Sequence, residues 1–442
     1  MPRLKSFNLK KYLPVVLIGL VLFLGFYLRT VLAQYFIKES GDIRLYADWA
    51  EKYWLLGARD FYIYPQWYYA PPNYPPLLSL VYAAAYWLYE HKYYLAELHN
   101  VIKIPPAAFI VYFYEHGLNL LLKLPGILAD IGLTILIYQL VKKLTNNLKR
   151  ALAAGAFYLF NPVSIFLSGV WGQTDSLVSL FGLLSFVTLG LNKFWLSLPL
   201  LFLSFYIKPN WGIFIPLYVF LVLFKKPKIK EIVLGFVLTL VLFIGSTQPF
   251  VKDNIFSFSK WLWTERLLPT ATVAQKASVS AFNLHTIFYT IDKDSVSSPY
   301  LGIPGNFLGL FSYVLINIFT FAYIKRQKVS LASVMVGIFS IGFGSYLFLT
   351  NMLERYFFQS FAPLIVLMFS SPGALVYALV INIAVFANIF YAFFRRSWGS
   401  LSDIFVANNF LFVRLISLIN LASWFLILNK TSVFLDNKKS TI

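Results

Sequence analysis

The sequence predicts an all-α, polytopic integral membrane protein with about twelve spanning helices, within a range of about 11 to 13. Hydrophobic residues make up 59% of the 442 positions, and charged residues make up only 12%. Apolar runs recur along the whole chain, and a spanning helix needs about 20 apolar residues. Soluble domains do not use so apolar a composition, so the sequence indicates a membrane protein.

Basic clusters between the apolar runs predict the ends and the orientation of the spans, because Lys and Arg favour the cytoplasmic side. The predicted spans are residues 13–34, 119–141, 150–169, 175–192, 194–207, 210–224, 231–248, 302–324, 329–349, 355–371, 373–393 and 408–428. Both termini are then cytoplasmic, and Arg395 and Arg396 break the charge rule. The first run lacks a small-residue cleavage site, which favours an anchor helix. Runs 194–207 and 210–224 are short and contain proline, which favours a broken or re-entrant pair.

The formal charge of +19 and the absence of cysteine limit the possible functions. The basic clusters are explained by topology, so we expect no nucleic-acid partner. A chain without cysteine forms no disulfide and has no thiolate ligand or nucleophile. No spacing of His or acidic residues is typical of a metal site, so the sequence predicts no cofactor, although a divalent ion would be compatible with it.

The chain is predicted to form one membrane domain with two long extracytoplasmic loops, residues 35–118 and 249–301. Most of the 18 acidic residues lie in or beside these loops. Long loops in a tightly connected bundle are usually functional. In the first loop, apolar residues at helical spacing predict an amphipathic helix from Ile43 that lies on the membrane, and a second helix over 77–90 is expected after Pro75 and Pro76.

Two aspartates of the first loop are candidates for a site. Asp42 directly precedes the predicted helix, so it is either an N-cap that accepts backbone N–H groups or a general base at the membrane surface, and the two roles are compatible. Asp48 lies four residues from both Arg44 and Lys52, which favours a solvated ion-pair face.

Five segments, spread over most of the chain, carry a family resemblance. They are Gly41 to Trp49, Asn73-Tyr74-Pro75-Pro76-Leu77, Leu124 to Asp130, Phe160-Asn161-Pro162 followed by Trp171-Gly172-Gln173-Thr174-Asp175-Ser176, and Asn351-Met352-Leu353-Glu354-Arg355-Tyr356. These segments resemble motifs of the GT-C superfamily of membrane glycosyltransferases, and above all its bacterial mannosyltransferase-like members. Leu353 stands where many members of that superfamily have histidine, so the role of that histidine does not transfer.

The resemblance implies a GT-C fold and an enzyme that moves a hexose, mannose or glucose, from a polyprenyl-phosphate donor. The acceptor would be a glycan, a lipid or a protein, and the site would face the extracytoplasmic side. Asp42 matches the family's catalytic base. A phosphate is already a good leaving group, so one carboxylate suffices and direct displacement inverts the anomeric carbon, in contrast to glycoside hydrolysis, which needs two carboxyl groups.

The remaining candidates would bind the substrates. Arg355 is the first candidate for the donor phosphate because its planar fork can bind two oxygens, and Lys208 and His285 are further candidates. The substrate-binding candidates are Asp48, Tyr74, Trp171, Gln173, Asp175 and Glu354. Each cation also has a plainer explanation: Arg355 could pair with Glu354, Lys208 could anchor at lipid headgroups, and His285 could simply be hydrogen-bonded. Asp175 could cap the span that follows it.

Asp130 differs from the other candidates because it lies deep in a predicted span. A carboxyl group in hydrocarbon needs a partner or a cavity, so Asp130 has a functional or a structural polar role. A lipid transporter or flippase without catalysis is the alternative function. Transporters tend to show internal repeats and polar helix breaks at the midplane. The sequence has no convincing repeat, and apart from Asp130 its polar residues are peripheral, which favours the enzyme.

Overall fold

The computed structural model describes residues 9–37, 39–272 and 274–437, and most of them lie in helices. The first half contains α1 (Leu9–Leu32), α2 (Gly41–Leu56), α3 (Ala58–Phe61), α4 (Pro76–Glu90), α5 (Tyr93–Ile102), α6 (Ala107–Thr145), α7 (Leu148–Leu159), α8 (Pro162–Ile165), the π-helix η1 (Phe166–Trp171), α9 (Asp175–Gly190), α10 (Phe194–Ile207), the 3₁₀-helix η2 (Pro209–Phe214) and α11 (Ile215–Lys225).

The second half contains α12 (Ile229–Thr247), the 3₁₀-helix η3 (Gln248–Phe250), α13 (Ile255–Trp261), the π-helix η4 (Leu262–Leu267), α14 (Leu268–Thr272), α15 (Leu284–Phe288), α16 (Gly305–Arg326), α17 (Leu331–Phe348), the 3₁₀-helices η5 (Tyr356–Ser360) and η6 (Pro372–Ala374), α18 (Phe361–Ser370), α19 (Leu375–Phe394) and α20 (Gly399–Asn437). Within the described residues the strands are limited to the antiparallel hairpin of β1 (Pro299–Tyr300) and β2 (Ile303–Pro304). The all-α prediction is confirmed.

Seven helical segments in the described part of the chain are long and apolar enough to cross a membrane. They are Ala107–Thr145, Leu148–Trp171, Ile229–Phe250, Gly305–Arg326, Leu331–Phe348, Pro372–Phe394 and Asp403–Thr431. Each of them contains or overlaps a predicted span, so the chain is a multi-pass membrane protein. The other predicted spans fall on shorter apolar helices of 10–17 residues, so the count of twelve stays a prediction.

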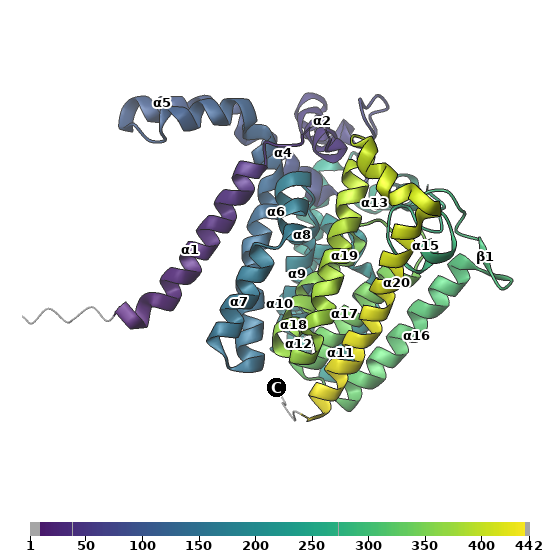
Figure 1. Cartoon of the computed structure of the whole chain (residues 1–442). Helices are drawn as coiled ribbons and strands as arrows, with labels where there is room; N and C mark the ends of the chain where they lie inside the picture. The colour runs from purple at the N-terminus through teal and green to yellow at the C-terminus, as the bar shows by residue number, and fades with distance from the viewer. Residues whose placement is uncertain (1–8, 38, 273, 438–442) are drawn as a thin grey trace, which may run out of the picture.

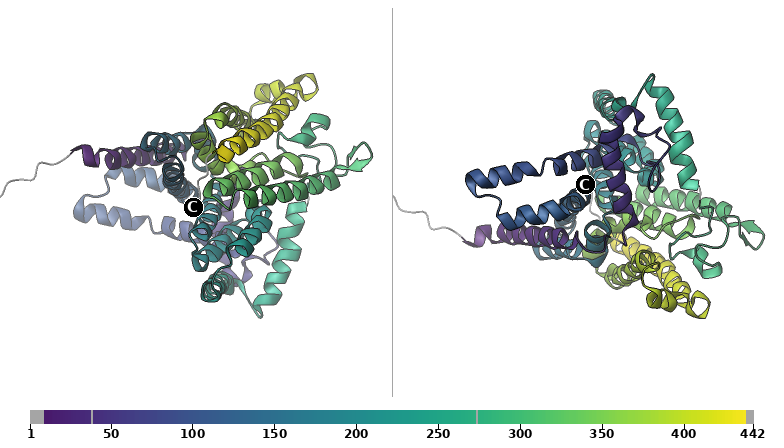
Figure 2. Two further views of the ribbon diagram at one scale, coloured as in Figure 1. Left: turned by 90° about the horizontal axis from the view of Figure 1, so that it is seen from below. Right: turned by 90° about the horizontal axis from the view of Figure 1, so that it is seen from above.

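The helices form a bundle with loop helices at one end. Figure 1 shows α2 and α4 at this end, which we call the platform end, whereas α11 and α12 reach the opposite end. Helix α1 leans away from the bundle, and α5 projects sideways from the platform end (Figures 1 and 2). Helix α17 is central, since every residue from Leu331 to Leu347 is buried. A helix that is apolar all round suits such a position.

Aromatic contacts join α2 to α4 at the platform end. The rings of Tyr46 and Tyr82 are stacked with centroids 4.6 Å apart, and Trp49 meets Tyr74 edge to face at 5.8 Å. The indole N–H of Trp49 donates to the Ala70 carbonyl at 2.8 Å. Proline at the first position of α4 is favourable because its missing N–H would be unpaired there in any case. These contacts fix the position of α2, which carries Asp42, on the bundle.

Arg395 and Arg396 break the charge rule, and an ion pair explains the position of Arg395. The Arg395 guanidinium at the end of α19 forms an ion pair with Asp292 of the loop 249–301. Its cation therefore holds this loop against the bundle. A basic residue that forms an ion pair within the protein need not follow the rule that Lys and Arg favour the cytoplasmic side.

Candidate functional site

The π-helix η1 and the turn after it deliver Trp171 and Gln173 to the platform end. Asn161 caps the N-terminus of α8 by accepting the Val163 N–H at 2.9 Å, and η1 begins directly after α8. Gly172 ends η1 with φ of +81°, a conformation that glycine adopts without strain. A Cβ at Gly172 would also come within 2.3 Å of Ile43 on α2, so this turn needs glycine for two reasons.

Lys123 fixes the backbone of this turn, and the sequence did not identify it. Its buried ammonium donates to the carbonyls of Ala33, Gly169 and Val170 at 2.8, 3.2 and 2.7 Å. The Ser40 hydroxyl donates to the Trp171 carbonyl at 2.8 Å. A lone lysine within an apolar run was the available signal, since a cation at such a position must find partners inside the protein.

Asp42 lies in the first turn of α2 and accepts two hydrogen bonds from the turn after η1. The Trp171 Nε1–H donates to Asp42 Oδ2 at 2.8 Å, and the Gln173 Nε2–H donates to the same oxygen at 2.6 Å. The N-cap interpretation of Asp42 is wrong, because Ser40 is the cap and its hydroxyl accepts the Ile43 N–H. Asp42 Oδ1 has no hydrogen bond to any described residue, so it is available to a ligand.

Arg355 lies over the ring of the same indole. Its Cζ is 5.2 Å from the centroid of the Trp171 ring, and its Nη1 donates to Glu354 at 2.6 Å. The Ser280 hydroxyl donates to the second oxygen of Glu354. Trp171 therefore joins a carboxylate and a guanidinium.

Lys208 and Asp175 form a second, fully buried ion pair at 3.0 Å, with side chains 3% and 1% exposed. The Lys208 ammonium therefore lies inside the protein and not among lipid headgroups, so the anchoring interpretation is wrong. Asp175 does not cap α9 either, because Thr174 precedes it at the cap and neither makes a side-chain cap bond.

These side chains form the candidate cluster, defined as Asp42, Tyr74, Trp171, Gln173, Asp175, Lys208, Glu354 and Arg355. Tyr74 belongs to it because Lys208 Nζ is 5.8 Å from its ring centroid. Three buried polar atoms of the cluster, Gln173 Oε1, Asp175 Oδ1 and Arg355 Nε, have no hydrogen-bond partner in the described part of the chain. Buried polar atoms are almost always paired, so the cluster has unused capacity for water or a polar ligand.

Asp48, the other candidate aspartate of the first loop, is not paired with the basic residues near it in sequence. Arg44 lies over the ring of Tyr69 and Lys52 over that of Tyr64. Neither forms an ion pair with Asp48 in the part of the chain that the structure describes, so the ion-pair interpretation is wrong. Asp48 Oδ2 is instead buried without a hydrogen-bond partner there, which keeps Asp48 as a candidate ligand.

His285 lies apart from the cluster in α15 and is held on both ring nitrogens. Tyr300 Oη is 2.7 Å from its Nδ1, and the Phe348 carbonyl is 2.9 Å from its Nε2. A neutral ring satisfies both contacts by accepting from the tyrosine and donating to the carbonyl. The plainer explanation of His285, a hydrogen-bonded histidine, describes this geometry.

The burial of His285 leads to a prediction about pH. Burial lowers the pKa of His285 below its usual 6.5, although the Phe348 carbonyl partly opposes this effect. The unfolded chain then binds a proton below about pH 6.5 that the folded chain does not bind. We expect the melting temperature to fall as the pH drops from 6.5 towards the lowered pKa, and His285→Gln to remove part of this dependence. His91→Gln, at a partly exposed site, is the control and should leave the pH dependence unchanged.

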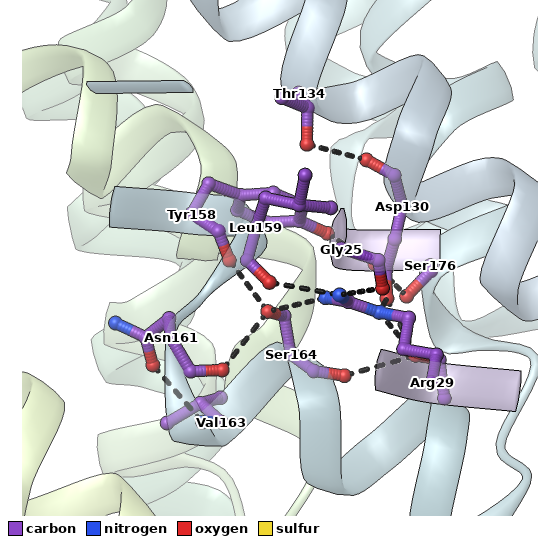
Figure 3. Close-up of polar contacts among 11 residues, drawn as sticks. Gly25, Arg29, Asp130, Thr134, Tyr158, Leu159, Asn161, Val163, Ser164 and Ser176 are labelled. Atoms are coloured by element: carbon purple, nitrogen blue, oxygen red, sulfur yellow. Dashed lines mark hydrogen bonds and ion pairs between the residues drawn. The ribbon is translucent and has the colours of Figure 1, made fainter. Parts of the chain in front are cut away.

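Asp130 is the centre of a buried network that ties α1 to α6, η1 and α9 (Figure 3). The Arg29 Nε–H and the Ser168 hydroxyl donate to its Oδ2 at 2.9 and 2.5 Å. The hydroxyls of Tyr158 and Ser176 donate to its Oδ1 at 2.7 and 2.6 Å. With four donors the carboxylate is fully satisfied, so Asp130 has the structural polar role. Its counter-ion Arg29 was not identified from the sequence.

No protein-family model and no curated protein matches the chain. Among the described residues, no group of three His, Cys, Asp or Glu side chains could hold a metal ion. The function therefore has to be argued from the candidate cluster and from the membrane-spanning bundle on which it sits.

Proposed function

We propose that the protein is an inverting membrane glycosyltransferase that moves a hexose from a polyprenyl-phosphate donor to an acceptor hydroxyl. One observation carries the proposal: a carboxylate with a free oxygen, Asp42 Oδ1, and a guanidinium, Arg355, both contact the indole of Trp171. The carboxylate suits a general base and the guanidinium suits a phosphate. The chain is a membrane protein, which favours a donor that is itself a lipid.

In the proposed reaction, Asp42 Oδ1 takes the proton from the acceptor hydroxyl. The acceptor oxygen then bonds to the anomeric carbon while the bond from that carbon to the phosphate oxygen breaks. The phosphate leaves with the bonding electrons on the opposite side, so the configuration inverts. Arg355 stabilises the developing negative charge, as preorganised cations do at such positions. No second carboxyl group is needed as an acid.

The two buried cations differ in their suitability for the phosphate. Arg355 keeps Nε unpaired in the described part of the chain and shares one nitrogen with Glu354, so it has N–H groups left for an anion. Lys208 is buried and paired with Asp175, and it contributes positive potential at closer range than a surface lysine. His285 has both nitrogens engaged, and we leave it outside the proposed phosphate site.

The topology belongs to the same proposal. We place twelve spans in the membrane with both termini in the cytoplasm and the platform end outside. The loop 35–118 then forms the catalytic platform of a GT-C enzyme, to which the five motif segments are similar. A bacterial plasma membrane supplies polyprenyl phosphates on that side. The sugar, mannose or glucose, and the acceptor follow only from the resemblance.

The decisive experiment is a transfer assay with the purified chain in detergent or nanodiscs. The donors are synthetic polyprenyl-phosphate mannose and glucose, and the measurement is release of polyprenyl phosphate together with the anomeric configuration of the product. The proposal expects release with inversion and no loss of rate in EDTA. Binding of the donor without any release, to water or to acceptor glycans, would instead support a lipid carrier.

Arg355→Gln is expected to weaken binding of the donor more than binding of the acceptor. Hydrogen bonds to charged groups contribute about 1.5–3 kcal/mol, which corresponds to a roughly 10- to 150-fold rise in the KM for the donor. Arg355→Lys should recover only part of this loss, because an ammonium lacks the planar fork. The control is Arg59→Gln, an exposed arginine of the loop 35–118, which should leave KM unchanged. An unaltered donor KM in Arg355→Gln would remove the phosphate role.

A further inference from the structure

A sideways projection at the platform end has no role in the proposed function. It consists of α5 and the first turns of α6, residues 93–117, which we call the arm. Figures 1 and 2 show the arm extending beyond the bundle beside α1. No residue of α5 is buried, and Val101 is 79% exposed. A helix without a buried face gains little from the bundle, so its exposed face needs another explanation.

The exposed residues of α5 are arranged as an amphipathic surface. Tyr94, Leu98, Val101 and Ile102 are all exposed and recur at helical spacing, so they share one face. Glu97, which is exposed and stands four residues before Val101, borders this face, and exposed Asn100 lies beyond it on the same side. Residues on the opposite side, such as His99, are only partly exposed. The helix therefore has an apolar face next to a polar edge.

The residue types on the arm and at its junction with α4 favour lipid over a protein partner. Lys92 Nζ lies 3.9 Å from the ring centroid of Tyr89 and 5.1 Å from that of Tyr114. Tyrosines whose rings pack beside a lysine are typical of the boundary between headgroups and acyl chains, because each has an apolar body and a polar tip. A protein-binding face of this size would more often bury its aromatic residues around a central pocket.

The length of α6 connects the arm to the membrane. Helix α6 has 39 residues, which is about 58 Å, nearly twice the ~30 Å hydrocarbon layer. Its first turns thus belong to the arm, where Val111 is 59% exposed. Further along, Leu128 and Ile135 are also exposed, on the apolar part of a helix that is long enough to span. The exposed face of the arm continues onto the helix that enters the lipid.

We propose that the arm is a membrane-interface anchor. Its apolar face, with Tyr94, Leu98 and Val101, lies at the acyl boundary of one leaflet, and its polar edge, with Asn100, faces water. The occupant of the exposed face is therefore the lipid of the leaflet at the platform end. This inference does not depend on the proposed reaction, and a chain with any other activity would have the same anchor.

The absence of cysteine from the chain allows a direct test with single spin labels. Val101→Cys and Asn100→Cys place labels on adjacent residues of one helix, one on the apolar face and one on the polar edge. The full chain is reconstituted in nanodiscs of phosphatidylcholine and phosphatidylglycerol. Accessibility to oxygen, which concentrates in lipid, and to a water-soluble nickel chelate is then measured for both labels. Both substitutions are at exposed sites, so the melting temperature should stay unchanged.

The expected result is a high ratio of oxygen to nickel accessibility at position 101, at least several-fold above the ratio at position 100. Labels at positions 94, 98 and 102 should follow position 101 and so reproduce the helical period. Equal nickel accessibility at positions 100 and 101 would overturn the proposal, because the arm would then lie in water. Protection of position 101 from both reagents, with dipolar broadening between labels, would also overturn it and would indicate a second copy of the chain on this face.

Discussion

Asp42→Asn is expected to lower turnover by about 10²- to 10⁴-fold, the usual contribution of a general base. Asparagine keeps an oxygen that can accept the N–H groups of Trp171 and Gln173, so the platform should remain assembled, but the amide cannot take the acceptor's proton. The KM for the donor should change little, because the phosphate is assigned to Arg355. Initial rates with a polyprenyl-phosphate sugar, measured at saturating acceptor, give both quantities.

The matched control for this variant is Glu51→Gln, which changes an exposed carboxylate of the same helix α2. It should keep the full rate. Full turnover in Asp42→Asn would exclude the base role. A loss of donor binding as large as the loss of rate would instead show that Asp42 holds the platform together, which the melting temperature of the variant would confirm.

Asp130→Leu is expected to have the largest effect on stability. It leaves the Arg29 guanidinium buried without its counter-ion, and breaking a buried pair from one side costs about 3–5 kcal/mol. The double variant Arg29→Met with Asp130→Leu removes both charges and should recover most of this loss. Thermal or denaturant unfolding in detergent measures both variants. Glu115→Gln, at an exposed position of the same helix α6, is the control. Equal destabilisation by the single and double variants would contradict the ion-pair explanation.

The fold was largely predictable because membrane helices are visible in the sequence as long apolar runs. Each long apolar helix contains or overlaps a predicted span, and α4 begins at Pro76 as its prolines indicated. The pair 194–207 and 210–224 was expected to be broken or re-entrant, and the 3₁₀-helix η2 separates α10 from α11 there. The arm was not predicted, because its apolar residues extend a long span in sequence and only the structure shows that they leave the bundle.

The candidate cluster was predicted better than its contacts. Asp42, Trp171, Gln173 and Arg355 come together although they lie in three distant segments, and here the motif resemblance supplied what spacing could not. The contacts of two aspartates were predicted wrongly because a partner close in sequence was considered first. Asp42 and Asp175 were each given a possible cap role, but both carboxylates bind residues far away in the chain. Local sequence cannot show such partners.

Buried cations were the main omission. Arg29 and Lys123 lie in apolar runs, where a basic residue is easily assigned to a helix end or to a lipid headgroup. Their partners are one carboxylate and several backbone carbonyls from other helices. A charge inside a membrane protein has to be satisfied internally, so both residues could have been marked as polar network members. Their partners, however, required the three-dimensional structure.

The π-helix η1 makes the length of its segment a determinant of the direction in which Trp171 points. A π-turn contains one residue more than an α-turn, and each helical residue rotates the following side chains by about 100°. Removing one residue between Phe166 and Val170 would let the segment wind as a regular helix, with Ser164 still in contact with Arg29. Trp171 would then point away from α2 and leave Asp42 without its indole. A chain shortened by one residue would thus lose the contact between Trp171 and Asp42.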